Sequence, residues 1–429
     1  MNFNSVENIV NLGAAAAFTT SGANVFREQL DSAPVRISER VQYMPWGADN
    51  MMPFDIINLI ESDETLATCQ MFNSEVCYGA GLRYAPGSAI PPVAERAREF
   101  AELNSLSELF LGSCQDFKFF GFAVSVIILS NDGKRICSVR RKEACYCRFA
   151  PADENGNIPF VHYANWRLAV ASEDMVESIP LLNRFAPAAD LEQRIASGSK
   201  IRKFAVVSRI PTVDATYYPI PYYAALFKGR WFSIKQLVAL AKEAKLKNSA
   251  PLKYQIEISS RYWNNIFQSE GITDKVKQME RVVKEKHNIL DFLTGAENSG
   301  KVLFSTFYSS PDGKEQHDVV INKIDVNKEG GEWSTDIQEA INVVCFTMRV
   351  HSNLVGSVPG KAQSNNSGSD KRELFTIAQA LQKPYHDILF NVHRLIIRFN
   401  GWVGVVPEIP FLMLTTLDKH ADALPAAAL

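Results

Sequence analysis

The sequence contains no long hydrophobic run and no basic N-terminal stretch. None of its apolar segments reaches the ~18–20 residues that a helix needs to cross a bilayer, so no membrane-spanning segment and no membrane partner are expected. The stretch Met1–Thr20 has no Lys or Arg before its small apolar run Ala14–Phe18, which argues against a secretory signal. The sequence therefore predicts neither a membrane anchor nor a signal peptide.

Cysteine is scarce, odd in number and irregularly spaced. Such a set lacks a disulfide framework and predicts reduced, buried thiols in a cytosol-like compartment. Cys145 and Cys147 stand near Cys137 and His162 and could suggest zinc, but the paired two-residue spacing of a zinc site is absent. We favour thiols buried on a hairpin and predict no metal and no cofactor. The seven cysteines are Cys69, Cys77, Cys114, Cys137, Cys145, Cys147 and Cys345.

A dominant charge of either sign is also missing. The formal net charge is -2 and the pI is about 6.4. A protein that grips nucleic acid through one basic face carries a large positive excess, so this class is disfavoured, although the chain could enclose nucleic acid while binding it weakly. Hydrophobic residues make up 46% of the 429 residues, which predicts an ordered protein with two or more packed regions.

Catalytic motifs are absent or incomplete. Gly356 and Gly360-Lys361 resemble a phosphate-binding loop, but only three residues separate the glycines, and Ala362 stands where a Ser or Thr should hold magnesium. No Gly-x-Ser-x-Gly nucleophile motif occurs. We therefore predict that the chain is not an enzyme. A hydrolase that uses the Gly356–Lys361 region remains a competing hypothesis, which absence of nucleotide turnover would remove.

The first half of the chain predicts a mixed α+β region. The run Phe122–Leu129 is apolar and rich in β-branched residues, and Asn131-Asp132-Gly133 is a strong hairpin turn into Ile136–Arg140. A second hairpin pairs Cys145–Phe149 with Pro159–Tyr163. The four helices expected before these strands are Pro53–Ser62, Glu64–Tyr78, Val93–Leu103 and Leu106–Phe119.

Two further helices bracket a mixed module in the second half. The helices are Tyr222–Leu246 and Thr335–Val350. Between them lies a charged helix, Lys275–Phe292, whose basic side is interrupted by acids, so a solvated or subunit-contacting face is favoured over a grip on nucleic acid. The strands expected in this module are Leu252–Ile258, Lys301–Tyr308 and Val319–Asp325.

A polar segment then separates the Thr335 helix from another long helix. Gly356–Ser369 has no aromatic residue and a single charge, Lys361. Loops of this length in compact domains are usually functional or disordered, and a nearly neutral one suits contact with something that moves past it. The helix Asp370–Phe399 begins with a capping box and should kink at Pro384.

This order of elements resembles that of tailed-bacteriophage portal proteins. The resemblance rests on Gly300-Lys301-Val302-Leu303, on His351-Ser352-Asn353-Leu354-Val355-Gly356, and on Ser364-Asn365-Asn366-Ser367-Gly368-Ser369 before a long helix. Trp46-Gly47-Ala48-Asp49-Asn50 and Tyr78-Gly79-Ala80-Gly81-Leu82 also resemble the opening of such chains. Ser352 replaces the proline often seen in the turn, so the turn can differ in detail. The resemblance covers about Gln42 to Trp402.

The resemblance implies an α+β, ring-forming portal fold without enzymatic activity. A homo-oligomeric ring, typically of twelve subunits, would form a channel at one capsid vertex, through which double-stranded DNA is packaged and ejected without regard to its sequence. Partners would be the terminase large subunit, a head-tail adaptor, and capsid and scaffold proteins. The chain would be assembled in the host cytoplasm and located in the virion. The alternative is another virion component, an adaptor or minor capsid protein without a DNA channel.

The resemblance also implies a division of the chain and two sets of site residues. The divisions are an N-terminal arm 1–40, an α+β wing 41–221, stem helix 222–246, a clip-containing α/β insert 247–334, stem helix 335–350, tunnel loop 351–369, a long kinked wing or crown helix 370–400 and a C-terminal segment 401–429. Residues that would face DNA, with weak phosphate contacts at most, are Lys361, Gln363, Ser364, Asn365, Asn366, Ser367, Ser369, Lys371 and Arg372. Residues that would contact neighbouring subunits are Ile341, Val344, Met348, Trp231 and Leu237.

Overall fold

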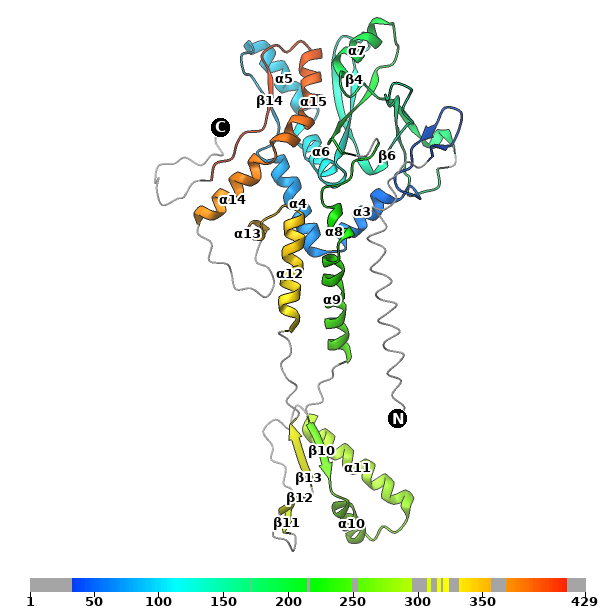
Figure 1. The fold of residues 1–429 in the computed structure, drawn as a ribbon, viewed down its shortest axis with the longest axis vertical. Helices are drawn as coiled ribbons and strands as arrows, with labels where there is room; N and C mark the ends of the chain where they lie inside the picture. Colours follow the sequence, from blue (N-terminus) through cyan, green and yellow to red (C-terminus); the bar gives the residue numbers. More distant parts are fainter. Residues whose placement is uncertain are drawn as a thin grey trace. The chain divides into compact units, whose positions relative to one another are not determined.

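The computed structural model divides into two compact units, Met1–Ala239 with Trp333–Leu429, and Leu240–Glu332. The chain leaves unit 1 within helix α9 (Trp231–Asn248) and returns at the start of α12 (Glu332–Thr347) (Figure 1). The structure describes residues 33–170, 172–213, 217–248, 254–294, 307–309, 315–317, 319–323, 332–355 and 368–414.

A three-stranded antiparallel sheet organises unit 1. Its central strand β4 (Phe122–Leu129) pairs with β5 (Ile136–Lys142) on one side and β9 (Lys203–Arg209) on the other. Successive side chains of a strand point to opposite faces. Phe122, Val124 and Val126 accordingly enter one hydrophobic cluster, whereas Ala123, Ile127 and Leu129 enter another. Both faces of β4 are therefore covered, which explains why its sequence is apolar throughout.

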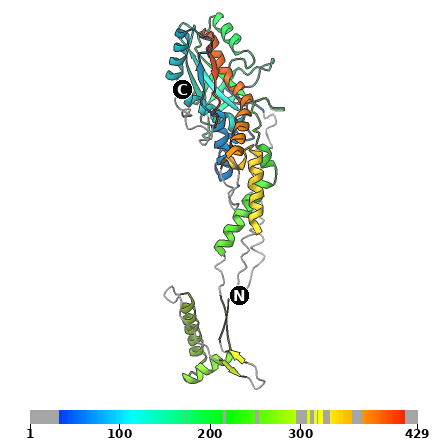
Figure 2. The ribbon, with the colours of Figure 1, turned by 90° about the vertical axis from the view of Figure 1, so that its left-hand side faces the viewer.

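Helices cover both faces of this sheet. The first cluster takes side chains from α3 (Met52–Glu61), α4 (Glu64–Tyr78) and α12. The second takes side chains from α5 (Pro91–Leu103), α6 (Leu106–Phe120) and α15 (Lys383–Phe399). Figure 2 shows α15 running along the sheet, where it contacts β9.

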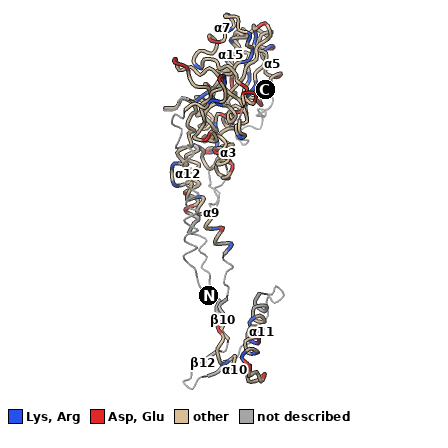
Figure 3. The backbone as a smooth tube through the Cα atoms, turned by 90° about the vertical axis from the view of Figure 1, so that its right-hand side faces the viewer, with Lys and Arg blue, Asp and Glu red and all other residues tan. Residues whose placement is uncertain are grey.

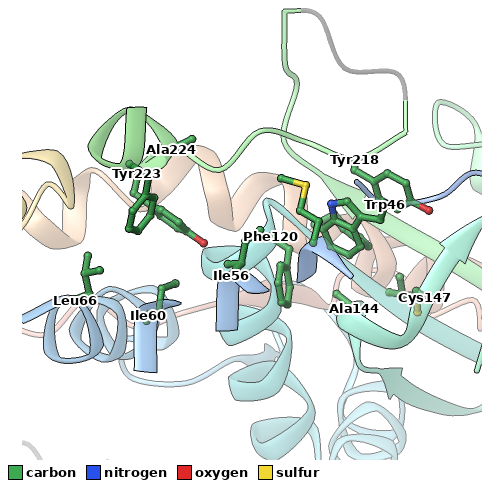
Figure 4. Close-up of a cluster of buried hydrophobic side chains, with 14 of the residues drawn as sticks. Trp46, Ile56, Ile60, Leu66, Phe120, Ala144, Cys147, Tyr218, Tyr223 and Ala224 are labelled. Atoms are coloured by element: carbon green, nitrogen blue, oxygen red, sulfur yellow. The ribbon is translucent and has the colours of Figure 1, made fainter. Parts of the chain in front are cut away.

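Aromatic side chains fill much of the first cluster (Figure 4). The rings of Trp46 and Tyr218 stack with centroids 4.5 Å apart and an interplanar angle of 4°. Tyr218 also donates its hydroxyl to the Met44 carbonyl oxygen at 2.7 Å, so its polar end is satisfied inside the core. The cluster thus ties the turn that precedes α3 to the segment that follows β9.

The smaller elements of unit 1 surround this core. Two 3-10 helices, Ala144–Tyr146 (η1) and Glu173–Met175 (η2), lie near a second sheet of three strands. That sheet contains β6 (Cys147–Phe149), β7 (Phe160–Tyr163) and β8 (Glu177–Pro180). Two further strand pairs are β1 (Val35–Arg36) with β2 (Gln42–Tyr43) and β3 (Arg83–Ala85) with β14 (Val406–Glu408). Helix α7 comprises Pro187–Ala196.

Unit 2 is small and also mixed. Strands β10 (Tyr254–Ile258) and β13 (Val319–Lys323) pair antiparallel, with Ile256 opposite Ile321. Ser259 caps the following helix by accepting from Tyr262 N–H at 3.2 Å. The described elements of this unit also include α10 (Ser260–Ser269), α11 (Lys275–Thr294), β11 (Phe307–Ser309) and β12 (Glu315–His317).

The predicted α+β class is confirmed, as are both predicted hairpins. The single helix predicted at Tyr222–Leu246 is wrong. It is two helices, α8 (Ala224–Lys228) and α9, because the chain is extended at Gly229.

The long helix predicted at Asp370–Phe399 is also two helices, α14 (Gly368–Ala380) and α15. Pro384 has no N–H, and its ring would clash with the carbonyl of Ala380, so the helix breaks at Leu381-Gln382 where the sequence had predicted only a kink.

The predicted loop 351–369 is shortened at both ends by helix. A single-turn helix, α13 (Ser352–Val355), follows α12, and α14 begins at Gly368. Residues 356–367 lie outside the described residues, as do residues 1–32 of the predicted arm, 301–306 of a predicted strand, 324–331 and 415–429.

Candidate functional site

The C-terminal end of α12, which leads toward residues 356–367, is closed by its own backbone. Arg349 adopts a left-handed conformation with φ of 57°. Val350 N–H donates to the Cys345 carbonyl oxygen at 2.9 Å, and Arg349 N–H donates to the Phe346 carbonyl oxygen at 3.0 Å. This pair of bonds is a Schellman motif, which satisfies carbonyls that a helix end leaves without partners.

A side chain from α4 completes the same helix end. Asn73 Nδ2 donates to the Met348 carbonyl oxygen at 2.9 Å and to the Tyr222 hydroxyl at 3.0 Å. The Asn73 side chain is buried, so losing these bonds would leave polar groups unpaired in the core. Asn73 of α4 therefore holds the C-terminal end of α12 in place.

The left-handed Arg349 gives a prediction about this helix end. Left-handed backbone is strained for any side chain except glycine. Arg349→Gly should leave the free energy of unfolding unchanged or raise it by about 0.5 kcal/mol, whereas Arg349→Val should lower it by roughly 1–2 kcal/mol. Chemical denaturation measures both. Arg372→Gly inside α14 is the control and should cost about 1 kcal/mol; equal losses at the two arginine positions would contradict the assignment of strain to Arg349.

The far end of α14 is held by a buried lysine of α6. Lys118 Nζ donates to Gln382 Oε1 at 2.7 Å and lies 3.8 Å from the centroid of the Tyr385 ring. Burial lowers the pKa of Lys118 below its ordinary value. Gln382 also donates to the Ala378 carbonyl oxygen at 3.0 Å. Side chains of the core thus fix the corner between α14 and α15.

Helix α9 is anchored through a buried ion pair. Lys235 Nζ lies 2.6 Å from Asp63 Oδ2 and 3.0 Å from Glu64 Oε1. Asp63 is at the same time the N-cap of α4, because its Oδ1 accepts from the N–H groups of Thr65 and Leu66. A backbone hydrogen bond and the Lys235 ammonium lower the pKa of Glu64. One carboxylate therefore joins the start of α4 to the first turns of α9.

Most of the predicted DNA-facing residues lie outside the described part of the chain. These are Lys361, Gln363, Ser364, Asn365, Asn366 and Ser367. Ser369 and Lys371 are exposed in the first turn of α14, and Arg372 beside them is half-buried. The role of all nine residues stays a prediction.

The predicted subunit contacts of α12 require a correction. Ile341, Val344 and Met348 are buried in the first cluster of their own chain, so they are not available at the surface. The surface of the same helix carries Phe346, whose exposure is 83%, with Glu339 and Asn342 beside it. The sequence alone could not show that the cluster containing α4 covers these three side chains.

The predicted contacts of α9 are divided between interior and surface. Trp231 remains partly exposed, whereas Leu237 is half-buried. Lys228 and Arg230, which immediately precede Trp231 in the chain, are exposed. The start of α9 thus presents an aromatic ring among basic residues, and the outer face of α12 presents one among acidic and polar residues.

The structure describes the residues of the zinc hypothesis but not those of the phosphate-loop hypothesis. Cys145 lies in η1 and Cys147 begins β6, while His162 binds Ser178 Oγ and the Gln42 carbonyl oxygen, each at 2.9 Å. Within the described ranges, no three His, Cys, Asp or Glu side chains form a group that could hold a metal ion. Gly356, Gly360 and Lys361 lie outside the described residues.

None of the helices described by the structure combines the length and the apolar character that crossing a bilayer requires.

Comparison with known proteins identifies the fold but no sequence family. No family model and no curated protein matches the sequence. A chain of the virion of a native gene transfer agent (GTA) particle aligns with a TM-score of 0.53 and 12% identity over 93% of this chain and 90% of that chain. A chain from the neck of the empty GTA particle, computed with C6 symmetry, gives a TM-score of 0.54 and 13% identity over 88% of this chain and 86% of that chain.

A chain from the neck of the native GTA particle, computed with C12 symmetry, gives a TM-score of 0.51 and 14% identity over 83% of this chain and 84% of that chain. At these identities the likeness establishes a shared fold. It extends over most of both chains in all three comparisons.

Proposed function

We propose that this chain is a portal protein, a non-enzymatic subunit of a ring through which double-stranded DNA enters and leaves a phage-like capsid. The observation that carries the proposal is the fold shared with chains of the GTA virion and neck over most of both chains. The matched chains come from a virion and its neck, and a portal protein would belong to such a particle. The order of elements in the sequence resembles that of portal proteins as well. The ring would sit at the portal vertex of the virion after assembly in the host cytoplasm.

Within this proposal each part of the chain has a role. Residues 41–221 form the wing, and α9 and α12 form the stem. Unit 2 contains the clip, which meets the terminase large subunit during packaging and a head-tail adaptor afterwards. Residues 356–367 with the start of α14 form the tunnel loop. Capsid and scaffold proteins would contact the outside of the ring.

The charge distribution suits passage of a polyanion. Lys and Arg are interspersed with Asp and Glu along the described chain (Figure 3), and the formal net charge is -2. Affinity for DNA rises steeply with the number of phosphates that basic residues neutralise. A subunit with a formal net charge of -2 would therefore let DNA slide, because it offers little overall electrostatic attraction to phosphates.

The surfaces of α9 and α12 supply a contact between copies. A ring requires a heterologous contact, in which two different surfaces of one chain meet on neighbouring copies. Phe346 projects from an α12 face with Glu339, and Trp231 follows the basic Lys228 and Arg230. Opposite charges around two exposed aromatic rings favour pairing of these surfaces between neighbours.

Imaging of the purified protein tests the proposal. Particles seen end-on should be closed rings with a central hole, and the described fold should place α12 and α14 toward that hole. A solitary protomer at high concentration, or a particle solid at its axis, would overturn the portal assignment. A ring whose hole is not approached by residues 356–367 would support the adaptor or minor capsid alternative.

Shortening the polar segment tests its role in the channel. Deleting residues 361–367 should leave ring assembly intact, because α12 and α14 have their own anchors in the core, and should reduce DNA packaging or retention. Packaged DNA per particle is the measurement. Replacing the same residues with a Gly/Ser segment of equal length is the control and should retain more DNA. Normal packaging by the shortened protein would refute the assignment of a tunnel loop.

A further inference from the structure

Two buried thiols meet where α4 contacts α12. Cys69 Sγ and Cys345 Sγ lie 3.9 Å apart, although their residues are 276 positions apart in the chain. Both side chains belong to the first hydrophobic cluster, and neither forms a disulfide. Two sulfur atoms at this distance are in van der Waals contact, so the two thiols already lie side by side, as the formation of a disulfide requires.

The surroundings keep the two thiols facing each other. One turn along each helix, Asn73 Nδ2 donates to the Met348 carbonyl oxygen at 2.9 Å, which holds α12 against α4. The thiol–thiol hydrogen bond lowers the pKa of Cys345 and raises that of Cys69, and the Lys235 ammonium favours both thiolates. Either sulfur can donate this hydrogen bond, and the thiol that ionises becomes the reactive thiolate.

We propose that Cys69 and Cys345 form a peroxide-sensitive dithiol that closes to a disulfide and staples α12 to α4. The Cys345 sulfur attacks one oxygen of hydrogen peroxide, the O–O bond breaks, and a sulfenic acid and one water form. The Cys69 sulfur then attacks the sulfenic sulfur, the S–O bond breaks, and hydroxide leaves as water with the Cys69 proton. In sum, two thiols lose two electrons and two protons, and one peroxide is reduced to two waters.

The timing of this reaction rests on the proposed function, whereas the chemistry does not. A virion subunit is assembled in a reducing cytoplasm and later meets an oxidising exterior. The thiols would stay reduced while α12 packs against α4 during folding and assembly. They would form the disulfide after the virion is released from the cell. The staple would then fix α12 against α4.

The test is oxidation of the purified full chain. Incubation with hydrogen peroxide, followed by alkylation and peptide mass spectrometry, should yield a Cys69–Cys345 linked peptide that dithiothreitol removes. The thermal unfolding temperature should rise by roughly 5 °C or more, because the bond closes a very long loop. Cys345→Ser and Cys69→Ser should each lose the linked peptide and the rise, with unfolding temperatures before oxidation reporting that they fold.

Two controls make the outcome decisive. Cys137→Ser removes the exposed thiol and should leave the linkage and the temperature rise unchanged. Detection of only unlinked, overoxidised or intermolecularly linked Cys69 and Cys345 would overturn the proposal. If the Cys69–Cys345 disulfide forms in a protein that assembles no ring, the dithiol proposal stands and the portal function is rejected. If a ring assembles but the disulfide does not form, the portal function stands and the dithiol proposal is rejected.

Discussion

Val344→Asp should unfold the protomer, whereas Phe346→Asp should leave it folded and prevent it from associating with other copies. The two residues are neighbours on α12, but Val344 is 0% exposed and Phe346 is 83% exposed. Placing a carboxylate in the apolar first cluster without a partner should cost about 4 kcal/mol or more. At position 346 the same carboxylate meets water, so the free energy of unfolding should change by about 0.5 kcal/mol or less.

Two measurements separate these effects. Chemical denaturation reports the stability of each variant, and sedimentation velocity reports the size of the assembly. Asn342→Asp adds the same charge to the same exposed face without removing an aromatic ring, so it should reduce assembly less than Phe346→Asp. The surface proposed for subunit contact is wrong if Phe346→Asp assembles like the unmodified chain, and the burial argument is wrong if Val344→Asp is as stable as Asn342→Asp.

This pair of variants shows what sequence pattern could establish about α12. The resemblance implied that Ile341, Val344 and Met348 contact neighbouring subunits, but the structure buries all three in the first cluster of their own chain. This helix contacts α4, whose Asn73 and Cys69 come from a distant part of the sequence. Periodicity shows that one face of a helix is covered but cannot show whether its own chain or a neighbour covers it.

Local signals were reliable where the structure depends on local chemistry. Strand β4 and its Asn131-Asp132-Gly133 turn were predicted because a continuous β-branched run and a left-handed glycine are visible in the sequence, and Gly133 has φ of 73°. Strand β9 was missed, although it pairs with β4 along its whole length. Its four central residues, 204–207, form too short an apolar run to distinguish strand from helix without knowledge of the partner.

Long-range pairing explains the other omissions. Strand β3 pairs with β14, and the two come from opposite ends of the chain, so neither carries a signal by itself. Lys235 carries no sequence signal of burial, yet its side chain is buried against Asp63. Breaks at Gly229 and before Pro384 turned two expected helices into four. For the paired strands and for Lys235 the missing information was the identity of a distant partner, whereas the two helix breaks arise from local backbone geometry.

Asp63→Ala should be among the most destabilising polar substitutions in unit 1, at about 3–5 kcal/mol. It removes the N-cap of α4, whose loss alone costs about 1 kcal/mol, and it leaves the Lys235 ammonium buried with only the largely exposed Glu64 nearby. Removing one partner of a buried ion pair leaves an uncompensated charge, and that charge accounts for most of the loss.

A mutant cycle separates the cap from the charge. Asp63→Asn retains an N-cap acceptor but loses the charge, so it should be less harmful than Asp63→Ala. Lys235→Met removes the ammonium while retaining the length of the side chain, and Asp63 keeps its bonds to Thr65 and Leu66 N–H. The double variant Asp63→Asn with Lys235→Met should be more stable than Asp63→Asn alone, because no charge is then left buried without a partner.

Chemical denaturation of the four variants gives the coupling energy directly. Lys383→Met, which breaks the exposed pair with Asp387, is the control and should change the free energy of unfolding by about 0.5 kcal/mol or less. If Asp63→Ala costs no more than this control, the buried pair does not anchor α9. A different result is that Asp63→Ala costs as much as expected and Lys235→Met also weakens ring assembly. In that case the ion pair between α9 and α4 positions Trp231 for contact with the neighbouring subunit. The buried interior of the protomer would then determine the geometry of the proposed contact surface.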